Sequence, residues 1–276
     1  MGRTGIYACG ESVSRRNSLE SVALFSLKQE APASIGGSTF TFWPSFTDLM
    51  LSFVLIVLII LFVVSKMIAA GTENLDRVRR SQQSIETQIE QGIGKQYKVV
   101  TLSDRDGANI NKEMANRQAD VYIIDKLDRQ TITFSDKVLF DSGQSDIKAA
   151  GYEILNVVGP IIAKNLDNIG EIQIQGHADI SFEDDFNLQL AANRAIAVYK
   201  FLQVNVGIDP AQYLMSATSF GKYKPVGRDA GNDYSYAQLQ AANANETLMA
   251  KNRRIEIVLF YKNHSSLQLF EQINIA

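Results

Sequence analysis

The stretch Glu171-Ile172-Gln173-Ile174-Gln175-Gly176-His177-Ala178-Asp179 decides the fold of the C-terminal half of the chain. Its apolar and polar residues alternate as far as Gly176, which is typical of a strand with one buried face. Asp179 follows in a loop, and apolar residues then recur at helical spacing, namely Leu188, Ala191, Ala195, Val198 and Leu202. We therefore expect a helix that packs on the sheet containing this strand.

Further elements extend this unit on both sides. The expected elements are strands at 121–124, 131–134 and 254–259 and a helix at 147–163. Their order predicts an α+β sandwich at 120–263, of about 140 residues. Residues 96–119 are interpreted as a linker, with a turn at 104–107.

An apolar run from Leu49 to Val64 contains Ser52 as its only polar residue. The helix can extend over 44–70, which is enough for the roughly 20 residues that a membrane span needs. A cleavable signal peptide is the alternative, but over forty residues precede the run and it exceeds a typical signal core. We therefore expect a retained transmembrane helix.

Asp48 lies at the start of this apolar run. Thr47-Asp48 could simply mark the helix start, where a carboxylate complements the helix dipole. However, Pro44 offers a start one turn earlier, which would place Asp48 inside the helix. A carboxylate at the membrane edge is expensive to desolvate, and this marks Asp48 as a candidate ion carrier.

After the span, a 3,4 rhythm continues through Leu75, Val78, Gln82, Ile85 and Ile89, in phase with apolar residues of the span itself. This predicts a short dimeric coiled coil at 71–95. The alternative is an amphipathic helix that packs on its own domain, because two heptads are few. Gly92 and Gly94 are expected to end the helix.

Composition excludes several functional classes. The formal net charge of -3 gives no case for nucleic-acid binding. One cysteine and two histidines, without a cluster, argue against a disulfide and against a metal site. No nucleophile–base pair or phosphate loop is recognisable, so neither an enzyme nor a cofactor is expected. Residues 1–43 are expected to form a flexible cytoplasmic tail and 264–276 a C-terminal tail.

Several motifs of the C-terminal half occur together. They are Phe140-Asp141-Ser142-Gly143, Gly176-His177-Ala178-Asp179, Asn187, Leu190, Asn193-Arg194-Ala195, residues 221–226 and residues 252–257. In this order they resemble the OmpA-like peptidoglycan-binding domain. The resemblance implies that Asp179 and Arg194 bind the diaminopimelate of uncrosslinked wall peptide. Between Val226 and Asn252 the chain is longer than is usual in that family, with a short helix expected at 236–244.

The chemistry of this pair agrees with that ligand. Diaminopimelate is zwitterionic, so a carboxylate can hold its ammonium and a guanidinium its carboxylate. Asn187 and Arg194 are seven residues apart and share a helix face. Spacing alone leaves open that Asp179 and Arg194 merely pair with each other. His177 is either a structural neighbour of the site or a ligand-binding residue, and Arg254 is a further candidate.

The start of the span carries Trp43, Asp48 and Met50. This pattern resembles the B subunit of the flagellar stator and the related B subunit of Zorya anti-phage motors. The resemblance implies that Asp48 carries the ion, that two such chains pair, and that their partner is a multi-span membrane subunit of the MotA type. It also implies an inner-membrane protein with a cytoplasmic N-terminus and a periplasmic C-terminal domain.

These features together predict a peptidoglycan-anchored subunit of an ion-driven, proton-coupled membrane motor. The mixed charge of the tail and the linker length favour a Zorya-type defence motor. A flagellar stator subunit and a purely structural wall tether are the alternatives.

Overall fold

A computed structural model describes residues 43–103, 110–228 and 234–262. The chain divides into two compact units, Met1–Leu55 and Ile56–Ala276. The tails expected at 1–43 and 264–276, Trp43 apart, and the turn expected at 104–107 lie outside the described residues.

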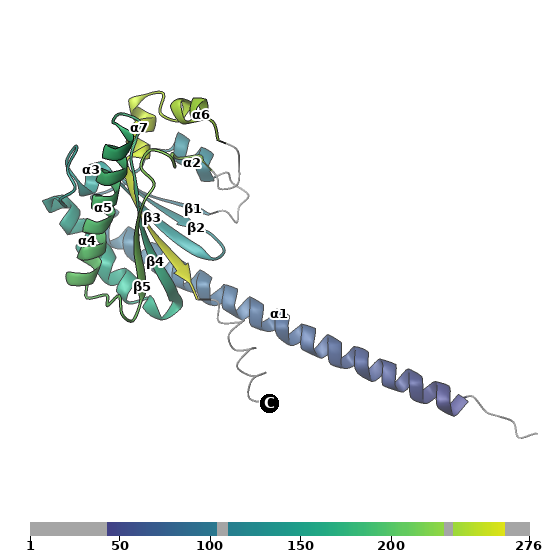
Figure 1. The fold of residues 1–276 in the computed structure, drawn as a ribbon. Coiled ribbons are helices and arrows are strands. Elements are labelled where there is room, and N and C mark those ends of the chain that lie inside the picture. The colour runs from purple at the N-terminus through teal and green to yellow at the C-terminus, as the bar shows by residue number, and fades with distance from the viewer. Residues whose placement is uncertain (1–42, 104–109, 229–233, 263–276) are drawn as a thin grey trace, which may run out of the picture. The chain divides into compact units, whose positions relative to one another are not determined.

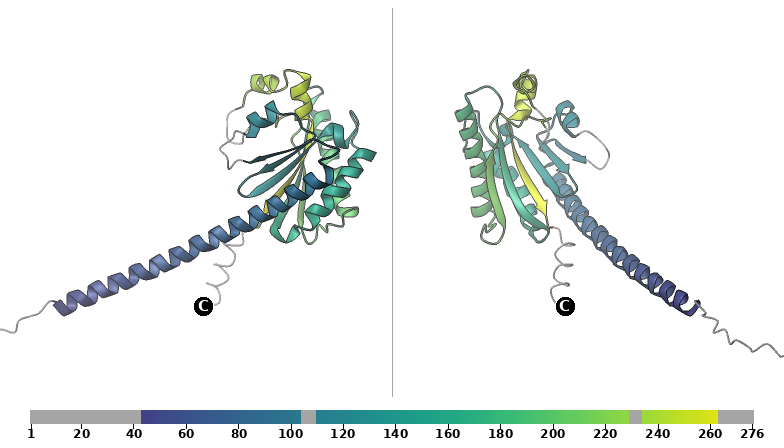
Figure 2. Two further views of the ribbon diagram at one scale, coloured as in Figure 1. Left: turned by 180° about the vertical axis from the view of Figure 1, so that it is seen from behind. Right: turned by 45° about the vertical axis from the view of Figure 1, so that its right-hand side comes forward.

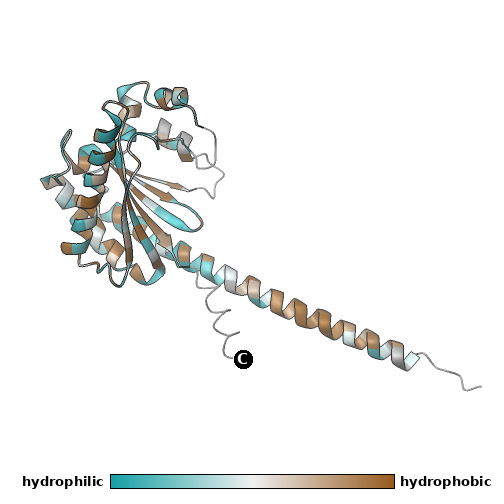
Figure 3. Ribbon diagram, viewed as in Figure 1, coloured by the Kyte–Doolittle hydropathy of each residue, from teal (hydrophilic) through white to brown (hydrophobic). Residues whose placement is uncertain are grey.

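Helix α1 (Trp43–Ile93) is 51 residues long and unbroken (Figure 1). It is the one helix of the described residues that is long and apolar enough to cross a membrane. Its most apolar window has a mean hydropathy of 2.9, seen as the brown stretch of α1 in Figure 3. Every side chain from residue 49 to residue 64 is exposed, as the apolar surface of a lipid-facing helix would be.

Asp48 lies in the second turn of α1, because the helix already begins at Trp43. The hydroxyl of Thr47 donates to the carbonyl oxygen of Trp43 at 2.9 Å, a bond within a formed helical turn. Thr47-Asp48 is therefore not the start of the helix, and the carboxylate belongs to its interior.

The last turns of α1 correct the coiled-coil prediction. Val78, Ile85, Ile89 and Ile93 are buried, and the three isoleucines belong to the domain's own core. The structure thus shows the alternative, an amphipathic helix that packs on its own domain. Apolar residues at 3,4 spacing can pack either on the helix of a second chain or on a sheet of the same domain. The sheet offers the larger apolar surface. The helix ends at Ile93, as Gly92 and Gly94 predicted.

Gln82 fixes α1 to the sheet at the centre of this contact. Its side chain is fully buried, and its amide donates to the carbonyl oxygens of Lys126 and Arg129 at 2.8 and 3.1 Å. Gln130 in turn donates to the carbonyl oxygen of Gln82 at 3.1 Å. The polar residue in the apolar stripe therefore supplies hydrogen bonds to two carbonyl groups at the turn of the hairpin at 121–135.

Six strands form one mixed sheet in the order β1-β2-β3-β6-β4-β5. They are β1 (Val99–Ser103), β2 (Val121–Asp125), β3 (Arg129–Ser135), β4 (Ile169–His177), β5 (Leu214–Ser219) and β6 (Arg254–Tyr261). The outer pairs β1–β2 and β4–β5 are parallel, and the inner pairs are antiparallel. The strands expected from alternation are confirmed, whereas β1 and β5 were not predicted.

The helices after α1 are α2 (Ile110–Asn116), α3 (Asp136–Leu139), α4 (Ala149–Ala163), η2 (Leu166–Asn168), α5 (Asp184–Val204), α6 (Tyr236–Ala241) and α7 (Glu246–Asn252). Residues 96–119 are therefore not simply a linker, because β1 and α2 lie within them. The helix expected at 236–244 is α6, and α7 was not predicted.

Helices α4 and α5, with the end of α1, cover one face of the sheet (Figure 2). Their apolar side chains pack on the inward residues of β2, β3, β4 and β6. On the other face, Met114 of α2 packs with Leu102, Tyr122 and Ile124 in a smaller cluster. The domain is thus an α+β sandwich whose second sheet face is only partly covered.

Candidate functional site

Asp179 lies in the loop after β4 and is almost fully buried. One carboxylate oxygen accepts the backbone N–H of Ser181 at 2.8 Å, which fixes the turn. The other oxygen is in an ion pair with the guanidinium of Arg253. A buried carboxylate that is paired in this way is oriented before any ligand arrives.

Arg194 extends from α5 toward the segment that follows Phe140. Its Nε donates to the carbonyl oxygen of Gln144 at 2.8 Å, and a terminal nitrogen donates to that of Asp141 at 3.3 Å. The guanidinium also lies 5.1 Å from the ring centre of Phe140. Burial lowers the pKa of Arg194, although Asp136 opposes this shift. Both of these hydrogen bonds run to main-chain carbonyls, so the backbone conformation of this loop, rather than its side chains, orients the arginine.

Asp136 is a site residue that sequence analysis missed. One carboxylate oxygen lies 3.4 Å from Arg194 and 3.5 Å from Arg253, between the two guanidinium groups. Burial raises the pKa of this carboxyl even though both arginines lower it. Its position, directly after strand β3, was the available signal, because polar residues at strand ends commonly line sites.

A cavity of about 410 Å³ opens between these side chains. Its charged lining is balanced, with three cations and three carboxylates, namely Lys137, Arg194, Arg253, Asp136, Asp179 and Glu246. A cavity lined by both signs suits a ligand that carries both an ammonium and a carboxylate.

Asn187 lines the same cavity, and its side-chain nitrogen is used within the protein. Its amide donates to the carbonyl oxygens of Asp179 and Phe182 at 3.2 and 2.8 Å. It thereby holds the loop between β4 and α5. These bonds let Asn187 position Asp179, while its place in the cavity lining agrees with the sequence prediction of a ligand-binding residue.

His177 does not line this cavity. It is buried, stacks on Phe220 with ring centres 5.2 Å apart, and its Nε2 lies 3.5 Å from Glu256. Burial lowers its pKa to about 4, assisted by Arg254. Side chains alternate along a strand, so His177 faces away from its neighbour Gly176, which packs on α5.

Arg254 is likewise on the other side of the sheet. Its Nε donates to Glu256 at 2.6 Å, and it does not line the Asp179–Arg194 cavity. Arg253, its neighbour, lines that cavity instead. Arg254, the candidate from the sequence, and Arg253 therefore lie on opposite faces of the sheet, because adjacent residues of an extended chain point in opposite directions.

Comparison with known proteins agrees with this architecture. Residues 139–238, which include Asp179 and Arg194, match the model of the OmpA family. The peptidoglycan-associated lipoprotein of Pseudomonas aeruginosa is 30% identical over 119 residues, 43% of this chain and 58% of that protein. That of Rhizobium meliloti is 35% identical over 96 residues, 35% of this chain and 52% of that protein. The chain spans about half the length of these curated relatives.

A solved structure of a MotB-like protein from Desulfovibrio vulgaris is also similar, with 18% identity and a TM-score of 0.47. The match covers 70% of this chain and 96% of that one. The domain after α1 is thus an OmpA-like α+β domain.

Proposed function

We propose that this domain binds the diaminopimelate-containing peptide of peptidoglycan and anchors the chain to the cell wall, without an enzymatic role. The observation that carries the proposal is the pair of Asp179 and Arg194, buried in one charge-balanced cavity. The ligand's ammonium would replace Arg253 on Asp179, and its carboxylate would take up the guanidinium groups. This exchange of partners leaves no buried charge unpaired.

Sedimentation with purified peptidoglycan tests this function. A suitable fragment begins at Gly71 rather than after α1, because Ile85, Ile89 and Ile93 complete the core. Asp179→Asn and Arg194→Lys should each weaken binding by about 10- to 150-fold, the cost of about 1.5–3 kcal/mol for a lost charge-assisted contact.

The matched control for Asp179→Asn is Asp185→Asn, the same chemical change at an exposed position of α5 outside the cavity. It should sediment as wild type does. Equal sedimentation of all variants would rule out the assignment of the site.

We further propose that the anchored chain is the B-type subunit of an ion-driven inner-membrane motor, with Asp48 as its proton carrier. Asp48 is the one acidic residue between Trp43 and Thr72, and it lies within α1. The motor would require a multi-span membrane subunit of the MotA type as partner. A second copy of this chain would approach along Leu61, Ile68 and Leu75, which are all exposed.

Asp48→Asn separates the motor from a purely structural tether. It should abolish the phenotype, phage protection for a Zorya-type motor or motility for a flagellar one, at unchanged membrane abundance. Asp76→Asn, an exposed residue of α1 beyond the apolar run, is the matched control and should be silent. If Asp48→Asn is fully active, the motor proposal fails and a purely structural tether is the function that remains.

A further inference from the structure

The sheet face opposite α4 and α5 carries a second cavity, of about 220 Å³. Helix α2 and the segment after β5 border it, and Met114, Ile124 and Val226 form part of its wall. Its lining shares no residue with that of the Asp179–Arg194 cavity. The two cavities are therefore separate sites.

The lining of this second cavity is strongly cationic. Five cations and one carboxylate line it, namely Lys126, Arg129, Lys224, Arg228, Arg254 and Glu256. The carboxylate is already used by neighbouring side chains, since Glu256 accepts from Arg254 at 2.6 Å and lies 3.8 Å from Lys224. Arg129 also has a carboxylate partner, since its Nε lies 3.5 Å from Asp128. With this second carboxylate counted, the described residues still leave an excess of positive charge around the cavity.

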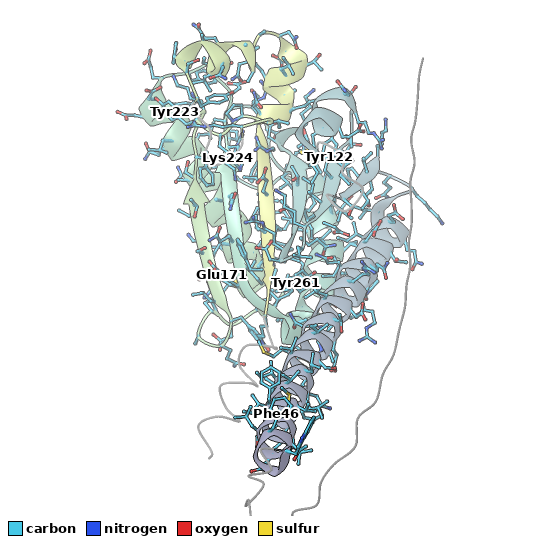
Figure 4. The ribbon with its side chains drawn as sticks, turned by 90° about the vertical axis from the view of Figure 1, so that its right-hand side faces the viewer. Phe46, Tyr122, Glu171, Tyr223, Lys224 and Tyr261 are labelled. Carbon is cyan, nitrogen blue, oxygen red and sulfur yellow. The ribbon has the colours of Figure 1, made fainter. Side chains whose placement is uncertain are left out.

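These cations are held in place by neighbouring groups. Lys224 donates to Gln175 at 2.9 Å, and its Nζ lies 4.4 Å from the ring centre of Phe220. The guanidinium of Arg228 lies 4.7 Å from the ring centre of Tyr234. Gln82 fixes the hairpin that carries Lys126 and Arg129. Figure 4 shows Lys224 and Tyr122 on either side of β6, the yellow strand. Such preorganisation reduces the entropy lost on binding.

The positive charges also act on one another. The pKa of Lys224 is lowered, first by burial and then, against the opposing effect of Glu256, by Arg254, Arg129 and Lys126. Like charges at this range destabilise each other's ionised forms. An anion in the cavity would remove that cost.

We propose that this cavity binds a phosphate group. A phosphate dianion presents several acceptor oxygens to donors from different directions, which suits lysines and arginines contributed by separate segments. The apolar wall would accommodate a compact uncharged part of the ligand.

The length of α1 identifies the source of the phosphate. Gln82 contacts the hairpin that carries Lys126 and Arg129. It follows Ala70, the last residue of the expected span, by 12 residues, or roughly 18 Å of helix. The headgroup layer extends only about 5–8 Å beyond the hydrocarbon on each side. The phosphate therefore belongs to a soluble molecule or a wall polymer rather than to a lipid headgroup.

Calorimetric titration of the detergent-solubilised full chain with inorganic phosphate tests the proposal, with chloride at equal ionic strength as the blank. Lys126→Gln combined with Arg228→Gln should weaken phosphate binding by about 100-fold, roughly tenfold for each cation. The matched double control, Lys164→Gln with Lys200→Gln, removes two exposed charges outside the cavity and should bind as wild type does.

The proposal would be overturned if the wild type did not bind phosphate. It would also be overturned if both double variants lost phosphate affinity equally. Unfolding curves without phosphate show whether the double variants fold as the wild type does. Arg194→Lys should keep phosphate binding. The proposal for the phosphate cavity and the proposal for the Asp179–Arg194 cavity can therefore be refuted independently. Affinity should also be unchanged in nanodiscs containing phosphatidylglycerol, and competition there would assign the cavity to a lipid headgroup instead.

Discussion

Replacing Ile89 with alanine distinguishes a helix that completes its own domain from one that joins two chains. Ile89 is fully buried in the core that α4, α5 and the sheet form. In a dimeric coiled coil the same substitution would weaken association and leave the isolated domain intact. The two hypotheses therefore predict losses in different measurements.

The expected loss follows from the burial of the side chain. Truncating a buried isoleucine to alanine typically costs about 2–5 kcal/mol, through lost transfer energy and the cavity left behind. This is a large share of the roughly 5–15 kcal/mol that stabilises a domain. For a domain of this size each kcal/mol lowers Tm by about 2–4 °C, so we expect a decrease of roughly 4–20 °C.

The assay is thermal and urea unfolding of the fragment from Gly71 to Ala276 at several protein concentrations. Leu75→Ala is the control, because Leu75 belongs to the same stripe but is 44% exposed, and it should change stability by less than about 0.5 kcal/mol. A loss for Ile89→Ala that disappears on dilution, or that Leu75→Ala matches, would refute the packing argument.

Three further predictions concern the same domain. His177 has a pKa of about 4 in the folded state, below its ordinary value, so stability should be full above about pH 6.5 and fall toward pH 4. The loss should reach about 2 kcal/mol at pH 5 in urea unfolding, and His177→Gln should flatten this part of the curve. Gln82→Leu should cost about 1–3 kcal/mol, because the Lys126 carbonyl loses its amide donor and the Arg129 carbonyl keeps only the N–H of Lys126, and an unchanged urea midpoint would contradict that role. In a Cys9→Ser background, cysteine at Leu75 should crosslink two full-length chains whereas cysteine at Ile89 should not, and crosslinking at both would contradict the buried position of Ile89.

Much of the domain could be predicted because its alternation and helical periodicity are strong. The strand at 171–176 and the helix stripe from Ala191 to Leu202 were confirmed, although Leu188, assigned to that stripe, is 49% exposed. The edge strand β5 escaped prediction because it is half-exposed and its residues do not alternate clearly. Edge strands bury less apolar surface than central ones, so their sequence signal is weaker.

Residues of the site could be predicted from the sequence, but the sheet face on which each side chain lies could not. Asp179 and Arg194 line one cavity, as the resemblance to the OmpA-like domain implied, whereas His177 and Arg254 lie on the opposite face. A strand reverses the direction of its side chains at every residue, so a motif of adjacent residues always mixes two faces. Only the register of β6 against β4, which pairs His177 with Arg254, decides which of them share a site.

Gln82 shows what kind of signal could have separated the two interpretations of α1. In a dimeric seam, a polar residue at an inward position must find its partner on the other chain, and it costs stability. Here its side-chain amide donates to two carbonyl oxygens at the turn of the β2–β3 hairpin, and its main-chain carbonyl accepts from Gln130. A buried side-chain amide whose two donated bonds go to one hairpin turn favours this register of α1 on the domain. The isoleucines would fit many apolar surfaces, so it is Gln82 that makes the docking of α1 specific.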